Sequence, residues 1–154
     1  MQLLAAPQAW AGEAKPANLL IDYPAFEELV RDLGPVRDAR RLTWDEFTQA
    51  AKGGSAILLD TRSAADFARG HLAGAVNLPF SEFTDAKLAA VLSEDTARPI
   101  YIYCDNNFSD NVAPVMTKRA PLALNIPTFI NLHGYGYTNV WELADVMSIA
   151  APSV

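Results

Sequence analysis

The chain has 154 residues, of which 51% are hydrophobic and 19% charged, and this length and mixture are those of one globular domain with its own core. Its formal net charge of −6 disfavours nucleic acid and anionic membrane surfaces as partners. A single cysteine, Cys104, excludes an intramolecular disulfide and a multi-cysteine zinc site, and no apolar run approaches the ~20 residues that a membrane span needs.

Residues 1–18 are expected to be a flexible N-terminus or the remnant of a signal peptide. Ala9-Trp10-Ala11 matches the small-x-small pattern of a signal-peptidase site, although no basic region precedes it and the apolar stretch is short. This pattern favours export to the periplasm, with the cytoplasm as the alternative.

Residues 19–38 are predicted to form a helical extension that packs on the outside of the core. Apolar residues at 26, 29, 30 and 33 form a helical stripe, and Gly34-Pro35 predicts its end.

From residue 39 to 150, short apolar runs alternate with helical patterns. Thr43 and Glu46 form a capping-box pattern, Gly53-Gly54 predicts the end of that helix, and Ser63 can cap the next one. The predicted strands are 40–42, 56–60, 75–78, 99–103 and 127–132, and the predicted helices are 43–52, 63–69, one or two within 81–92, 112–120 and 138–147. This alternation predicts an α/β domain, with a central parallel five-stranded sheet and helices on both faces.

The strand at 99–103 leads directly to Cys104. A polar loop follows Cys104, and the predicted helix at 112–120, capped by Asn111, follows the loop. An α/β protein mounts a nucleophile in this order of elements, above the carboxyl ends of its strands. Backbone N–H groups of the loop and of the helix N-terminus can hold an anion or a thiolate. The candidate binding loop comprises Asp105, Asn106, Asn107, Phe108, Ser109 and Asp110. A lone cysteine at a strand end can equally be a small buried hydrophobe, and this segment alone leaves both interpretations open.

Four ordered motifs make residues 39–147 resemble the rhodanese-like domain. They are Asp60-Thr61-Arg62, the turn Gly70-His71-Leu72-Ala73-Gly74-Ala75-Val76-Asn77-Leu78-Pro79, the strand leading to Cys104, and Leu132 with Gly134 and Trp141, which resemble a final strand, glycine turn and tryptophan-bearing helix.

The resemblance implies a sulfurtransferase. Cys104 would take the outer sulfur of a donor such as thiosulfate as a persulfide and pass it to cyanide, a thiol or a protein acceptor. It implies no metal or organic cofactor, and a role in structural support for Asp60, Arg62 and His71. His71 and His133 lie far apart in the sequence and make no metal-ligand pair by spacing.

The loop after Cys104 departs from the family pattern because it contains neither glycine nor a cation. Asp110 occupies the position of the arginine of related phosphatases, which makes phosphatase activity improbable. Asp105 and Asp110 predict weak thiosulfate activity, since carboxylates oppose a thiolate and repel a dianion. The alternative is a non-catalytic, sulfur-sensing or partner-binding module with an acidic, asparagine-rich loop. A third hypothesis is a thiol enzyme acting on a cationic or neutral substrate.

Overall fold

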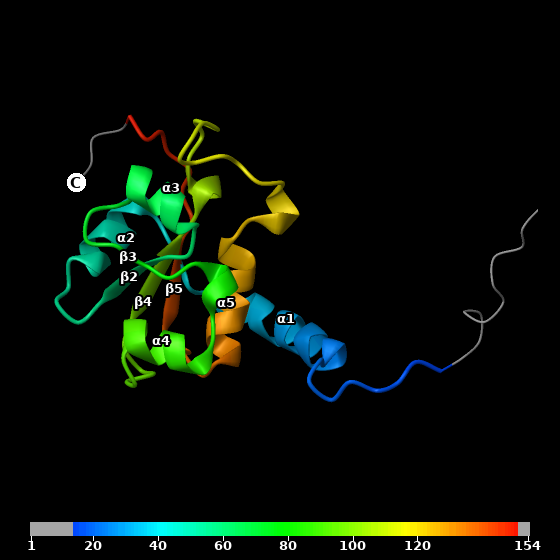
Figure 1. Cartoon of the computed structure of the whole chain (residues 1–154). Coiled ribbons are helices and arrows are strands. Elements are labelled where there is room, and N and C mark those ends of the chain that lie inside the picture. The colour runs from blue at the N-terminus through cyan, green and yellow to red at the C-terminus, as the bar shows by residue number, and fades with distance from the viewer. Residues whose placement is uncertain (1–13, 151–154) are drawn as a thin grey trace, which may run out of the picture.

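The computed structural model describes residues 14–150, so most of the expected flexible N-terminus lies outside the described residues. Five strands form one sheet in the order β1-β5-β4-β2-β3, and every neighbouring pair is parallel (Figure 1). The strands are β1 (Arg41–Leu42), β2 (Ile57–Asp60), β3 (Val76–Asn77), β4 (Ile100–Tyr103) and β5 (Val140–Leu143). The predicted α/β class and the five-stranded parallel sheet are confirmed, and β4 is the central strand.

Helices connect these strands. The α-helices are α1 (Tyr23–Asp38), α2 (Trp44–Ala51), α3 (Ala64–Arg69), α4 (Asp85–Leu92) and α5 (Asn125–Gly134), and short 3-10 helices are η2 (Phe80–Glu82), η3 (Asp105–Asn107) and η4 (Ala120–Leu122). The predicted capping box at Thr43 and Glu46 and the Ser63 cap are both present. Within residues 14–150, no helix is both long and apolar enough to cross a bilayer.

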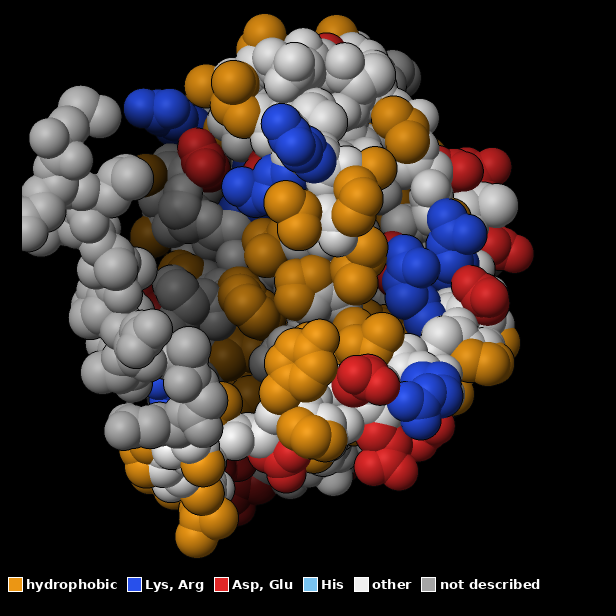
Figure 2. Space-filling model, turned by 90° about the vertical axis from the view of Figure 1, so that its right-hand side faces the viewer, with side chains coloured by type: hydrophobic (Ala, Val, Ile, Leu, Met, Phe, Trp, Pro, Cys, Tyr) orange, Lys and Arg blue, Asp and Glu red, His pale blue; other side chains and the backbone are white. Residues whose placement is uncertain are grey.

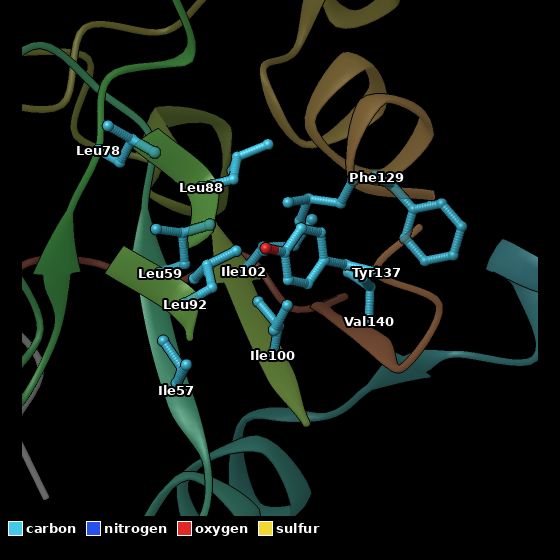
Figure 3. Close-up of a cluster of buried hydrophobic side chains, with 11 residues drawn as sticks. Ile57, Leu59, Leu78, Leu88, Leu92, Ile100, Ile102, Phe129, Tyr137 and Val140 are labelled. Carbon is cyan, nitrogen blue, oxygen red and sulfur yellow. The ribbon is translucent and has the colours of Figure 1, made fainter. Parts of the chain in front are cut away.

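Alternate residues of each strand face opposite sides of the sheet, and two core clusters result. The first cluster lies beside α4 and α5 and is drawn in Figure 3; it contains Ile57, Leu59, Leu78, Leu88, Leu92, Ile100, Ile102, Phe129, Leu132, Tyr137 and Val140. The second cluster lies beside α2 and contains Phe47, Leu58, Tyr103, Phe108, Val115 and Leu143. Cys104, the residue after β4, therefore lies at the edge of a sheet that has one core cluster on each face.

The last two predicted elements are exchanged in the structure. Residues 127–132, predicted as a strand, lie within α5, and residues 140–143, predicted as part of a helix, form β5. The apolar residues Ile126, Phe129 and Ile130 have helical spacing. Pro127 lies in the first turn of α5, where a backbone N–H has no acceptor within the helix, so the proline breaks no helical hydrogen bond. Val140 to Leu143 instead pairs with both β1 and β4.

The predicted helix at 112–120 is also absent from the described fold. Pro114 and Pro121 remove two backbone donors, and asparagine side chains take partners that a helix would need. Asn111 Oδ1 accepts the Thr117 N–H at 3.0 Å, and Asn106 exchanges two hydrogen bonds with the Lys118 backbone. This segment is therefore an ordered loop that ends in η4.

Helix α1 lies beside α5 and continues through Gly34-Pro35, so the predicted stop at this dipeptide is wrong. An internal proline costs a helix about 3 kcal/mol, and the ion pair that Arg37 forms with Glu142 of β5 contributes to offsetting it. Phe26 and Val30 of α1 remain 43% and 44% exposed. The side of the molecule from which α1 projects carries hydrophobic side chains across its middle and charged ones nearer its edge (Figure 2).

Candidate active site

Cys104 directly follows β4, at the carboxyl edge of the sheet, and is 1% exposed. The backbone N–H groups of Asn106 and Asn125 are directed at its sulfur, while the Asn107 N–H donates to the Cys104 carbonyl at 3.0 Å. Asn125 is the first residue of α5, so the sulfur faces the positive end of that helix's dipole. The sequence predicted that the helix N-terminus near Cys104 would belong to residues 112–120. In the structure it belongs to α5, which begins at Asn125.

The side chain of Asn107 fixes this arrangement. Its Oδ1 accepts the backbone N–H of Cys104 at 2.9 Å and the side-chain N–H of Asn125 at 3.0 Å. Its Nδ2 donates to the carbonyls of Leu143 and Asp145, both at 2.9 Å. One buried amide thus joins the cysteine, α5 and the chain after β5.

Burial and backbone N–H groups act in opposite directions on the pKa of the cysteine. Burial raises the pKa of the Cys104 thiol, the backbone N–H groups of Asn125 and Asn106 lower it, and the carboxylates of Asp105 and Glu142 raise it further. The net direction is upward, so at neutral pH the protonated thiol dominates. The site therefore holds a sulfur atom in a polar cradle without strongly favouring its anion.

A pocket of about 150 Å³ reaches Cys104, and one arginine from α1 and one from β1 line it. Arg37 donates to both carboxylate oxygens of Glu142, at 2.6 and 2.5 Å, and Glu142 is 3% exposed. Arg41 of β1 is exposed and, within the described residues, makes no ion pair or side-chain hydrogen bond. Arg41 is thus a cation at the pocket that an anion can reach.

Sequence reasoning missed Arg37, Arg41, Glu142 and Asn125 because the family motifs do not include them. The loop after Cys104 contains no cation, while the sheet places β5 beside β4 and β1 beside β5. The available signal was the parallel topology itself, which gathers the loops after several strands at one edge.

Asp60 and Arg62 lie together on the other side of β4 from this pocket. Arg62 Nη2 donates to Asp60 Oδ2 at 2.7 Å and to the Gly70 carbonyl at 2.7 Å, and Nη1 donates to the Pro114 carbonyl at 3.1 Å. The Tyr103 hydroxyl donates to the same Asp60 oxygen at 2.6 Å. This buried network connects the ends of β2 and β4 to the turn that follows α3.

His71 lies at the start of that turn and does not line the Cys104 pocket. Its Nδ1–H donates to the Phe67 carbonyl at 2.7 Å, and its ring stacks on Phe67 with the centroids 3.7 Å apart.

The loop residues after Cys104 point in several directions. Asp105 Oδ1 lies 3.6 Å from Arg62 Nη1 and has no hydrogen-bond partner among residues 14–150; burial raises the pKa of this carboxyl. Phe108 packs in the second core cluster, and Ser109 contacts the Met147 carbonyl. Asp110 accepts hydrogen bonds from Ser148 and from the Ile149 N–H, and this last bond lowers its pKa. Of the loop, Asn106 therefore contributes an N–H to the cradle around the sulfur, and Asn107 fixes the cradle with its side chain.

Within the described residues, no three His, Cys, Asp or Glu side chains cluster in a way that could hold a metal ion. The donors around Cys104 are backbone amides, asparagines and arginines, which suit an anion or a sulfur species.

Comparisons with known proteins identify a family and several similar proteins. The family described as Rhodanese-like domain matches residues 43–145. An uncharacterized protein of Bacillus subtilis, YqhL, is 34% identical over 84 residues, which are 54% of this chain and 62% of YqhL.

Two solved structures have a related architecture at lower identity. The human single-domain sulfurtransferase TSTD1 is 23% identical, with a TM-score of 0.48 over 68% of this chain and 88% of that one. A variant of EanB in complex with hercynine is 19% identical, with a TM-score of 0.49 over 73% of this chain and 25% of that one.

Proposed function

The chain belongs to the rhodanese-like domain family, and from that premise we propose that it is a sulfurtransferase that carries sulfane sulfur on Cys104. One observation carries the proposal: two backbone N–H groups, those of Asn106 and Asn125 from segments far apart in the sequence, converge on the Cys104 sulfur at the end of the central strand. Such donors stabilise a sulfur anion without a metal.

The proposed reaction is a double displacement. The Cys104 thiolate attacks the outer sulfur of thiosulfate, the sulfur–sulfur bond of the donor breaks, and sulfite leaves with the bonding electron pair. The resulting persulfide anion is held by the cradle. Cyanide or a thiolate then attacks the terminal sulfur, which leaves as thiocyanate or a new persulfide, and the Cys104 thiolate is restored.

The size of the pocket supports a small molecule as the sulfur donor. Its volume of about 150 Å³ equals roughly five waters at ~30 Å³ each, which suits a small inorganic or short organic sulfur donor. Arg41 supplies a positive charge to such a donor, and the Asp105 carboxylate opposes it. We therefore propose that donor binding depends on Arg41.

Thiocyanate formation from thiosulfate and cyanide tests the proposal. Cys104→Ser is expected to abolish turnover. Arg41→Ala is expected to raise KM for thiosulfate several-fold, and Arg31→Ala is the matched control because Arg31 lies on α1 outside the pocket. Turnover that survives in Cys104→Ser would overturn the mechanism.

The burial of Cys104 favours one second candidate, a sulfur-sensing or partner-binding module. A thiol that is 1% exposed and mainly protonated reacts slowly with donors in solution. This candidate predicts that Cys104 accepts sulfur but yields no multiple turnover with cyanide or small thiols. The enzyme proposal predicts repeated turnover.

A further inference from the structure

A larger cavity, of about 470 Å³, lies beside the second core cluster and shares no lining residue with the Cys104 pocket. Its walls are mainly apolar and include Trp44, Leu72, Phe108, Val115 and Met147. This volume falls within the range of roughly 300–1,000 Å³ that is typical of sites for organic ligands. The cavity is therefore large enough for a ring system or a short acyl chain.

The topology of the sheet explains why a cavity forms here. The chain after β1, β2, β4 and β5 contributes Trp44, Arg62, Phe108 and Met147 to its lining. After β2 the chain adds β3 on one side and then β4 on the other, so the strand order reverses at β2. Ligands of open α/β sheets bind outside the carboxyl ends of the strands at such a reversal.

Three charged side chains other than histidine line the cavity, and two of them are bonded within the protein. Arg62 is held by Asp60 and two backbone carbonyls, and Asp145 accepts the Trp44 N–H at 2.6 Å. Arg69 is exposed and makes no ion pair or side-chain hydrogen bond with any residue in the described part of the chain. An apolar cavity with an unpaired guanidinium complements a ligand that has an apolar body and one negative charge.

We propose that this cavity binds a small organic anion, with its apolar body against Trp44, Leu72 and Phe108 and its anionic group on Arg69. The site lies on the other face of the sheet from the Cys104 pocket, since Tyr103 lines the cavity and the next residue, Cys104, lines the smaller pocket. It does not depend on sulfur transfer, so its existence and the chemistry of Cys104 can be tested separately.

Fluorescent probes test the site on the full chain. The probe 8-anilinonaphthalene-1-sulfonate has an aromatic body and one negative charge, and N-phenyl-1-naphthylamine has the same rings without the sulfonate. We expect the sulfonate to bind saturably at one site per chain and more tightly than the uncharged probe. Energy transfer from tryptophan to the bound sulfonate is expected to fall strongly in Trp44→Phe and to persist in the control Trp141→Phe.

Charge variants complete the test. Arg69→Glu is expected to weaken sulfonate binding about tenfold, which corresponds to about 1.4 kcal/mol, and Arg69→Gln less so. Arg119→Glu is the control because Arg119 is exposed and outside the cavity, and Cys104→Ser is expected to bind like the wild type. Non-saturable binding, equal affinity for both probes, unchanged binding in both well-folded Arg69 variants, or full energy transfer in Trp44→Phe would overturn the proposal.

Discussion

Removing the Arg37 side chain is expected to destabilise the fold by about 2 kcal/mol, although α1 precedes the sheet. Arg37 makes two short hydrogen bonds to Glu142, and the carboxylate would be left without its cation at 3% exposure. Breaking a fully buried pair costs about 3–5 kcal/mol, and the 28% exposure of the Arg37 side chain reduces this figure because water can partly replace it.

Urea unfolding measures this effect. With a slope of about 2 kcal/mol per M, a loss of about 2 kcal/mol lowers the midpoint by about 1 M. Arg31→Ala is the matched control on the same helix, since its pair with Glu27 is exposed and worth only about 0.3–0.5 kcal/mol. Adding Glu142→Gln to Arg37→Ala should recover part of the loss, because it removes the unpaired charge. Equal midpoints for Arg37→Ala and Arg31→Ala would refute this account of the pair.

Three further predictions concern charge around the site. Alkylation of Cys104 by iodoacetamide should accelerate from neutral pH well into the alkaline range, because the raised pKa of Cys104 keeps its thiol protonated; a plateau near pH 7 would contradict this. Asp105→Asn should lower the pKa of Cys104 and raise its alkylation rate at pH 7, most strongly at low ionic strength, and the same salt series on the wild type is the control. It should also abolish the loss of stability that the wild type undergoes as pH rises through the raised pKa of Asp105, because asparagine resembles the protonated carboxyl. The urea midpoints of wild type and variant should therefore coincide at low pH and separate as pH rises; midpoints that differ by the same amount at every pH would contradict this. Asp110→Asn should leave the alkylation rate unchanged while lowering stability above the ordinary carboxyl pKa, since the lowered pKa of Asp110 gives stability that is lost only as pH falls; an altered alkylation rate would place Asp110 against the sulfur after all.

Local patterns predicted the parts of the fold where sequence and environment agree. The apolar runs ending at Asp60 and at Cys104 form the two neighbouring strands β2 and β4, and the capping signals at Thr43 and Ser63 begin helices. At these positions, burial on both faces and cap chemistry act within a few residues, so periodicity suffices.

The errors arose where distant contacts decide the structure. Val140 to Leu143 is a strand because it fills the space between β1 and β4, and Thr128 to Leu132 is helical because its apolar face covers β4. The site followed the same division. The place of Cys104 could be predicted from the strand before it. The proximity of Arg37, Arg41 and Asn125 to Cys104 could not, because it depends on the order of the strands and on the path of the long loop.

Intact-protein mass spectrometry tests the central claim most directly. Protein incubated with thiosulfate and then desalted should gain the mass of one sulfur atom, mapped to the peptide containing Cys104, and should lose it on exposure to cyanide with formation of thiocyanate. Cys104→Ser, treated identically, should show no gain. A wild-type protein that stays at its original mass with thiosulfate and with other sulfane donors would contradict the assignment of Cys104 as a sulfur carrier.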